Sequence, residues 1–155
     1  MIEKELAVLS VLNKTKFALY PLEYQYYDEY SYFDCKSKFA IVELKHRDFE
    51  LNRYNDYILE RDKYKRLMKE AFDSHKKFWY INSFESGEII GWNVTNLFLF
   101  KQMPPMQTLM CPATTEFNNN EKIEKEVYFL TLDCAEHIGY LPESLTRGQT
   151  RINTQ

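Results

Sequence analysis

The sequence predicts a single-domain α/β protein with a mixed β-sheet flanked by helices. A chain of 155 residues with 45% hydrophobic and 28% charged residues can bury one core and has the composition of a globular protein. Apolar residues recur first at helical spacing, then in alternation, and then at helical spacing again. The predicted order is helix, strand, strand, helix, strand, strand, loop, strand, which favours an α/β arrangement.

The N-terminal region predicts a short helix followed by irregular chain. Over residues 2 to 13, one helical face collects the apolar residues Ile2, Leu6, Leu9 and either Val8 or Leu12. Residues 17 to 33 are dense in tyrosine and are interrupted by Pro21. This composition favours extended or irregular structure over helix.

A hairpin and a long helix are expected next. Residues 31 to 36 and 39 to 46 predict two strands joined by a turn around Ser37. From residue 54 to 73, apolar residues recur every three or four positions, which predicts a helix of about five turns. The other face of this helix carries basic residues, namely Arg53, Arg61, Lys63, Lys65, Arg66 and Lys69.

The second half of the chain predicts another hairpin, a loop and a last strand. FWYINSF at 78–84 and EIIGWNV at 88–94 flank the turn ESG, whose glycine suits a hairpin. Residues 101–124 contain KQMPPMQ and EFNNNEK, which are typical of turns and loops, and EVYFLTL at 126–132 predicts a strand. We expect one domain over 1–145 and a flexible polar tail over 146–155.

Composition restricts the class of protein further. The three cysteines, Cys35, Cys111 and Cys134, are widely spaced and form no CxxC pair, which predicts reduced thiols and no structural zinc site. The charged residues of MIEKELAVLSVLNK argue against a signal peptide, and no apolar run is long enough to span a membrane. We therefore expect a soluble, cytoplasmic protein with no membrane partner. Its net charge of −3 neither demands nor forbids a nucleic-acid partner.

The strand expected over 39–46 places two opposite charges on one face. Because strand side chains alternate, Glu43 and Lys45 point the same way, about 6 to 7 Å apart along the strand. Asp34, on the preceding strand, reaches the same place if the register sets it across from Glu43. Two converging carboxylates can hold magnesium, and a neighbouring lysine can orient water or neutralise charge on a phosphate. The alternative is a same-face ion pair on a solvated edge strand, which stabilises little.

These residues resemble the motif of the PD-(D/E)xK nuclease superfamily. Asp34, eight intervening residues and then Glu43-Leu44-Lys45 are similar to the second half of that motif, whereas the first half is reduced to Phe33-Asp34. The resemblance covers about residues 1 to 95 and includes the N-terminal helix, the hairpin and the following helix. It implies a restriction-endonuclease-like fold, similar to that of small phage and mobile-element nucleases.

The resemblance also implies a chemistry and a role for each residue. It implies hydrolysis of DNA phosphodiester bonds with Mg²⁺ or Mn²⁺, Asp34 and Glu43 being metal ligands and Lys45 the catalytic lysine. The Leu44 carbonyl is a further implied ligand. A glutamate of the first helix is another, for which Glu5 is favoured over Glu3 by its deeper place in the helix. Lys63 matches the place of a supporting lysine or glutamine.

Other functions and partners stay open. The chain can be a catalytically inactive DNA-binding module, or an interaction or inhibitor protein that docks through the acidic segment 116–126. A small nuclease can gain specificity from DNA structure, from a homodimer or from a protein partner in a DNA-processing complex. From Lys45 to Lys77, ten Lys and Arg against seven Asp and Glu suit a phosphate backbone, or a solvated helix face. Several tyrosines can stack on bases or pack, namely Tyr24, Tyr26, Tyr27, Tyr30 and Tyr32.

Overall fold

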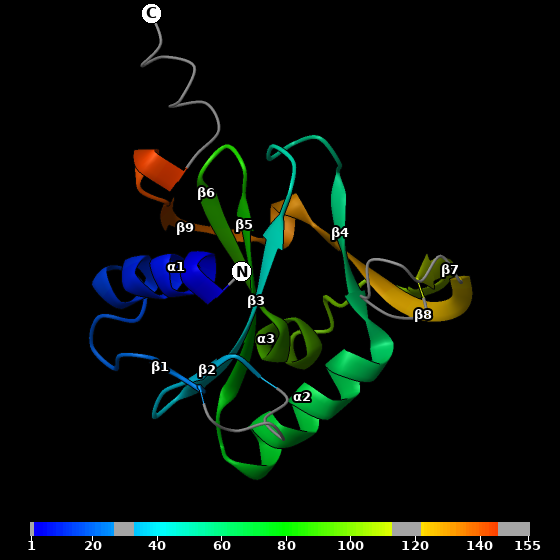
Figure 1. Ribbon diagram of the computed structural model, residues 1–155. Helices are drawn as coiled ribbons and strands as arrows, with labels where there is room; N and C mark the ends of the chain where they lie inside the picture. The colour runs from blue at the N-terminus through cyan, green and yellow to red at the C-terminus, as the bar shows by residue number, and fades with distance from the viewer. Residues whose placement is uncertain (1, 27–32, 113–121, 146–155) are drawn as a thin grey trace, which may run out of the picture.

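The computed structural model describes residues 2–26, 33–112 and 122–145. These residues form one mixed α/β domain with two sheets and three α-helices (Figure 1). The polar tail expected at 146–155 lies outside them. Within the described ranges, no helix is both long and apolar enough to cross a membrane.

The central sheet has six strands in the order β1-β2-β3-β5-β6-β9. The bounds are Glu23–Tyr24 for β1, Cys35–Lys36 for β2, Ala40–Arg47 for β3, Lys77–Phe84 for β5, Glu88–Asn93 for β6 and Glu136–Tyr140 for β9. β3 and β5 run parallel, and the other neighbouring strands are antiparallel. The sheet is therefore mixed, as the sequence predicts.

Each face of this sheet is covered by different elements. Val8 and Leu12 of α1 (Ile2–Lys14) share a buried cluster with Val42 and Leu44 of β3. The opposite face packs against β4 (Asp56–Glu60), α2 (Arg61–Asp73) and α3 (Val94–Leu99). In Figure 1, α1 (blue) and α2 (green) accordingly lie on opposite sides of β3. Residues of β3 thus alternate between an α1 face and an α2 face.

A second sheet of three strands lies beside the α2 face. Its order is β4-β8-β7, with β7 at Met106–Pro112 and β8 at Lys122–Thr131. All of its pairs are antiparallel. Short 3₁₀ turns at Leu132–Cys134 and Glu143–Leu145 flank β9. β8 thus pairs a segment near the end of the chain with β4, which comes from the middle of the sequence.

The five-turn helix expected over 54–73 is wrong in its first part. Residues 56–60 form β4, which pairs with residues 127–131 of β8, and the helix begins at Arg61. Tyr57 and Leu59 are buried with the alternation of a strand. The spacing of Tyr54, Tyr57 and Ile58 also fits the helical period, but pairing with a distant strand decides the conformation. From Leu67 to Ala71 the helical pattern holds, because the buried side chains of α2 face the core.

Besides β4, one helix and two strands were not predicted, and one strand was misjudged in length. α3 follows β6 directly, where the Asn93 side chain accepts the Asn96 backbone N–H and begins the helix. β7 lies inside the predicted loop 101–124, and β9 follows the strand that was expected to be last. That strand, β8, begins at Lys122 rather than 126. The first helix and the 78–94 hairpin are confirmed. The motif hairpin forms with a shorter first strand than expected, since β2 includes only Cys35–Lys36 of 31–36, and residues 31–32 lie outside the described ones.

Candidate functional site

The predicted metal ligands lie where β2 separates from β3. β2 pairs with β3 through Lys36 with Ile41 and Cys35 with Val42, and the same register sets Asp34 opposite Glu43. The Asp34 backbone N–H donates to the Val42 carbonyl at 3.0 Å. The next hydrogen bond to β3 is made by the Asp34 side chain, whose Oδ2 accepts the Leu44 N–H at 2.7 Å. The carboxylate thus replaces the next backbone bond and is fixed against β3.

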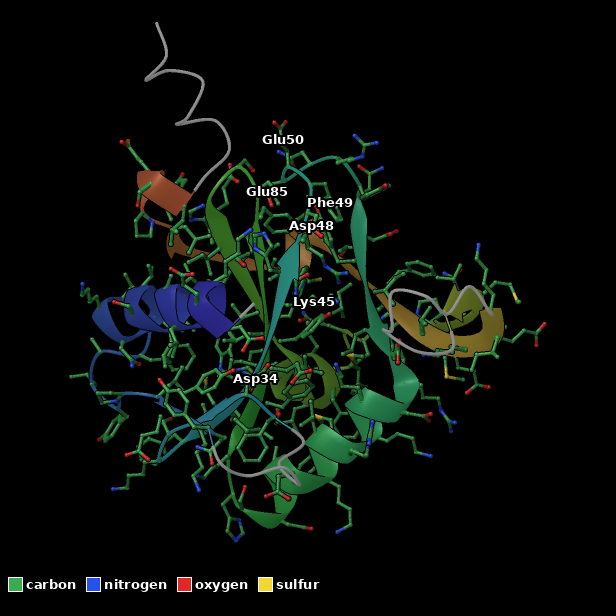
Figure 2. All side chains as sticks on the ribbon, viewed as in Figure 1. Asp34, Lys45, Asp48, Phe49, Glu50 and Glu85 are labelled. Atoms are coloured by element: carbon green, nitrogen blue, oxygen red, sulfur yellow. The ribbon has the colours of Figure 1, made fainter. Side chains whose placement is uncertain are left out.

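Glu43 and Lys45 both point to the α2 face of β3. Glu43 is largely buried and Lys45 is exposed. Lys63, in the first turn of α2, lies with its Nζ 2.5 Å from Oε2 of Glu43. Figure 2 shows Asp34 where β2 meets β3, and Lys45 further along β3. The structure thus brings Asp34, Glu43 and Lys63 together, with Lys45 beside them.

The two carboxyl groups influence each other strongly. Partial burial and the negative charge of Glu43 raise the pKa of Asp34 to about 7. The Asp34 and Glu43 side chains also share a hydrogen bond, while the Leu44 N–H and the Lys63 charge oppose the rise. Near neutral pH Asp34 therefore holds a proton for part of the time.

The two lysines differ in their electrostatic state. Desolvation and the neighbouring charges of Arg47 and Lys63 lower the pKa of Lys45, against the opposing charge of Glu43. Burial would also lower the pKa of Lys63, but the charge and hydrogen bond of Glu43 outweigh it and the pKa is raised. Lys63 therefore stays protonated and forms the ion pair with Glu43. Lys45 loses its proton more easily than an ordinary lysine. Among the described residues, Lys45 forms no ion pair within 4.0 Å.

The predicted ligand of the first helix is near the site but not part of a tight cluster. Glu5 accepts a hydrogen bond from the Tyr24 hydroxyl. Desolvation raises the pKa of Glu5, and the charge of Asp34 adds to this rise. Among the described residues, however, Glu5 forms no three-ligand group with Asp34 and Glu43 within 4.8 Å. Glu3 is exposed, and the metal contact of the Leu44 carbonyl stays a prediction.

Asp34 and Glu43 suit a hard divalent cation. Both offer carboxylate oxygen, and magnesium commonly binds proteins through one or two carboxylates while keeping several waters. The pKa of Asp34 is raised first by burial and then by the negative charge of Glu43, and a bound cation would offset both effects. Since Lys63 already lies against Glu43, the ion would share this carboxylate with the ammonium or displace it.

A buried network next to Lys45 was missed by the sequence analysis. Arg47 donates from Nε to the Asn82 side-chain oxygen at 2.8 Å and from Nη2 to the Ile58 carbonyl at 3.2 Å. The Tyr80 hydroxyl lies 3.2 Å from the same Nη2 and donates to the Ile58 carbonyl. This network ties β3 to β4 and β5. The strand alternation that selects Glu43 and Lys45 also selects Arg47, but its partners are distant in sequence.

The predicted basic face is largely engaged within the protein. Arg61 pairs with Glu126, and Lys69 pairs with Asp73. Arg53 lies over the Tyr54 ring, 5.8 Å from its centre. Of the tyrosines considered for base stacking, Tyr24 and Tyr26 contact each other, whereas Tyr27, Tyr30 and Tyr32 lie outside the described residues. Most of the segment 116–126 also lies outside them.

Comparisons of the chain with protein-family models, with curated proteins and with solved structures find no match. The fold and the geometry of the site therefore carry the functional interpretation.

Proposed function

We propose that this chain is a metal-dependent nuclease of the PD-(D/E)xK type that hydrolyses phosphodiester bonds in DNA. One observation carries the proposal: the Asp34 and Glu43 carboxyl groups meet where β2 leaves β3, with Lys45 and Lys63 beside them. Two carboxylates that can hold a metal ion, with a lysine of lowered pKa beside them, are groups that metal-assisted hydrolysis can use. Lys63 comes from α2, which lies in the connection between the parallel strands β3 and β5.

Each residue has a role in this proposal. Asp34 and Glu43 would hold Mg²⁺ or Mn²⁺, which when bound polarises the phosphate and lowers the pKa of a bound water. Lys63 orients the Glu43 carboxylate. Lys45 orients the attacking water and stabilises the charge that develops on the phosphate. A water oxygen bonds to phosphorus, the bond to the leaving oxygen breaks, and the proton of the water passes to solvent while the leaving oxygen gains one.

The charges around the site favour recognition of the DNA backbone over recognition of bases. Lys45 is exposed and forms no ion pair among the described residues, and the charges of Arg47 and Lys63 lie close to it although these two side chains are engaged by Asn82 and Glu43. Such cations bind phosphates irrespective of sequence and lose affinity as salt increases. Specificity would then come from DNA structure, a second copy of the chain or a protein partner.

A cleavage assay tests the proposal. Purified protein is mixed with supercoiled, linear, single-stranded or branched DNA and with RNA, in Mg²⁺, Mn²⁺ or chelator. We expect cleavage that requires metal and falls about a hundredfold or more in Glu43→Gln and in Lys45→Met. Lys14→Met, which removes an exposed lysine at the end of α1, is the matched control and should cleave as wild type.

The result that overturns the proposal is equally definite. A folded wild-type protein that cleaves none of these substrates, and whose calorimetric titration shows no Mg²⁺ or Mn²⁺ binding lost in Glu43→Gln, is not this nuclease. Metal-independent DNA binding without cleavage would instead assign the chain to inactive DNA-binding modules.

A further inference from the structure

A second group of potential metal ligands lies at the other end of β3, on the α1 face. His46 ends the α1-facing row of β3, Asp48 follows the strand, and Glu85 follows β5. One ligand atom from each lies within 4.8 Å of the others. Figure 2 shows Asp48 and Glu85 near each other at these strand ends, apart from Asp34. Since Glu43 points to the α2 face, the two groups lie on different sides of the sheet.

Hydrogen bonds hold the His46 imidazole in one orientation. Its side chain is only 3% exposed. Nε2 lies 3.1 Å from the Lys4 ammonium, which can only donate, and 3.3 Å from Glu85 Oε1, which can only accept. In the tautomer with its proton on Nδ1, the ring accepts from Lys4 at Nε2. Nδ1 then donates to the Ser83 hydroxyl at 2.9 Å. Metal-ligating histidines usually have one ring nitrogen held by such an outer hydrogen bond, which orients the other nitrogen toward the ion.

A lysine of the protein, Lys4, lies next to these ligands. The Lys4 ammonium contacts both His46 Nε2 and Glu85 Oε1, the latter at 3.3 Å. The group is therefore built around a cation. Lys4 is partly exposed and belongs to the first turn of α1, so its long side chain can swing away.

The spacing fits a small transition-metal ion. His46 Nε2 lies 3.3 Å from Glu85 Oε1 and 3.9 Å from Asp48 Oδ1. Ligands about 2.0 to 2.1 Å from a tetrahedral zinc ion stand about 3.4 Å from one another. Asp48 is exposed and provides a path from solvent. An imidazole with two carboxylates favours zinc over magnesium, which prefers oxygen alone.

We propose that His46, Asp48 and Glu85 form a site for Zn²⁺ or a similar divalent transition metal, in which Lys4 competes with the ion for the same place. The site is independent of the proposed nuclease centre. Metal binding would replace the ammonium by an ion that links the ends of β3 and β5, and the fourth position would be left to water or a ligand.

Titration with Zn²⁺ alone, followed by NMR of the His46 ring, tests this site. We expect the ring signals of wild type to shift with Zn²⁺ and not with Mg²⁺. Lys4→Met should tighten the dissociation constant about tenfold or more, because the competing charge is gone, whereas Lys14→Met on the same helix should not change it. Asp48→Asn, an exposed substitution that spares the core, should weaken binding about tenfold or more, and Ser83→Ala about 10- to 100-fold.

Two results would overturn the proposal. One is a His46 ring that does not respond to millimolar Zn²⁺ in either wild type or Lys4→Met. The other is binding that is unchanged in Asp48→Asn and in a folded His46→Gln protein. Because Asp34→Asn and Glu43→Gln should leave the His46 response intact, failure of this site and failure of the nuclease centre are distinguishable.

Discussion

The Lys63 ammonium lies 2.5 Å from the Glu43 carboxylate and joins the first turn of α2 to the middle of β3. On the other side of Glu43, the Asp34 carboxyl shares a hydrogen bond with it. One carboxylate of the pair is thus balanced by a lysine, and the pKa of the other, Asp34, is raised to about 7. The protonation of Asp34 therefore depends on both Glu43 and Lys63.

Stability should decrease as pH rises from about 4 to about 7. The pKa of Asp34 is about 7 in the folded protein and near 3.8 ordinarily, so the folded state binds more protons than the unfolded state between these values. The loss should be on the order of 2 to 4 kcal/mol. Asp34→Asn, which still accepts the Leu44 N–H and can donate to Glu43, should remove it. Urea unfolding at pH 5 and pH 8 in chelator measures both.

The matched control for this titration is Asp73→Asn, because Asp73 is exposed and pairs with Lys69 on the surface. It should retain the wild-type dependence. Parallel pH profiles for wild type and Asp34→Asn would show that Asp34 is not the responsible group.

Substitutions on either side of the acid pair should move the pKa of Asp34 in opposite directions. Glu43→Gln removes the neighbouring negative charge and should lower it, whereas Lys63→Met removes an opposing positive charge and should raise it. NMR titration of the Asp34 carboxyl carbon in metal-free protein measures each shift. Shifts of the same sign in both variants would contradict the arrangement.

Lys45 should contribute to the rate of cleavage and not to metal binding. Because its side chain forms no ion pair with the carboxylates, Lys45→Met should lower kcat about 10² to 10³-fold and leave the calorimetric affinity for Mn²⁺ nearly unchanged. Lys45→Arg should recover little, since the planar guanidinium differs in shape from the compact ammonium and places its charge and donors elsewhere. An equal loss of metal affinity in Lys45→Met would assign this residue to the metal site instead.

Arg47 should matter for stability far more than its exposed neighbour Lys45. Arg47→Met would leave the Asn82 oxygen and the Ile58 carbonyl without this donor, at a cost of about 2 to 4 kcal/mol. Lys45→Met, on the same strand and face, should cost less than about 0.5 kcal/mol. Chemical denaturation of the two variants compares them directly, and equal losses would argue against the network.

Gly91 should accept a side chain only at a cost in stability. An added Cβ would lie 2.9 Å from Ile138 Cδ1 and 3.3 Å from both Ile81 Cγ1 and Trp79 Cε3. Gly91→Ala should therefore destabilise the protein by about 1 to 3 kcal/mol. Gly139→Ala meets only one close atom, the Val11 Cγ1 methyl of α1, and should cost less. Thermal unfolding of both variants tests this order.

The local sequence pattern was enough to predict the hairpin that carries Asp34 and Glu43. The alternation over β3 places Glu43 and Lys45 on one face whatever the strand's neighbours are, because side-chain direction follows from the backbone. The first helix and the hairpin of β5 and β6 are likewise short-range structures with clear periods. Asp34 could be placed opposite Glu43 because a hairpin pairs residues close in sequence.

Only the tertiary structure decided the elements and sites that depend on distant partners. Residues 56–60 fit a helical period, yet they form β4 because β8 pairs with them from 127–131. The His46, Asp48 and Glu85 group joins the ends of parallel strands and includes Lys4 from α1, so no local spacing marks it. Periodicity reports which face of an element is buried, whereas pairing and the meeting of side chains depend on which elements pack together.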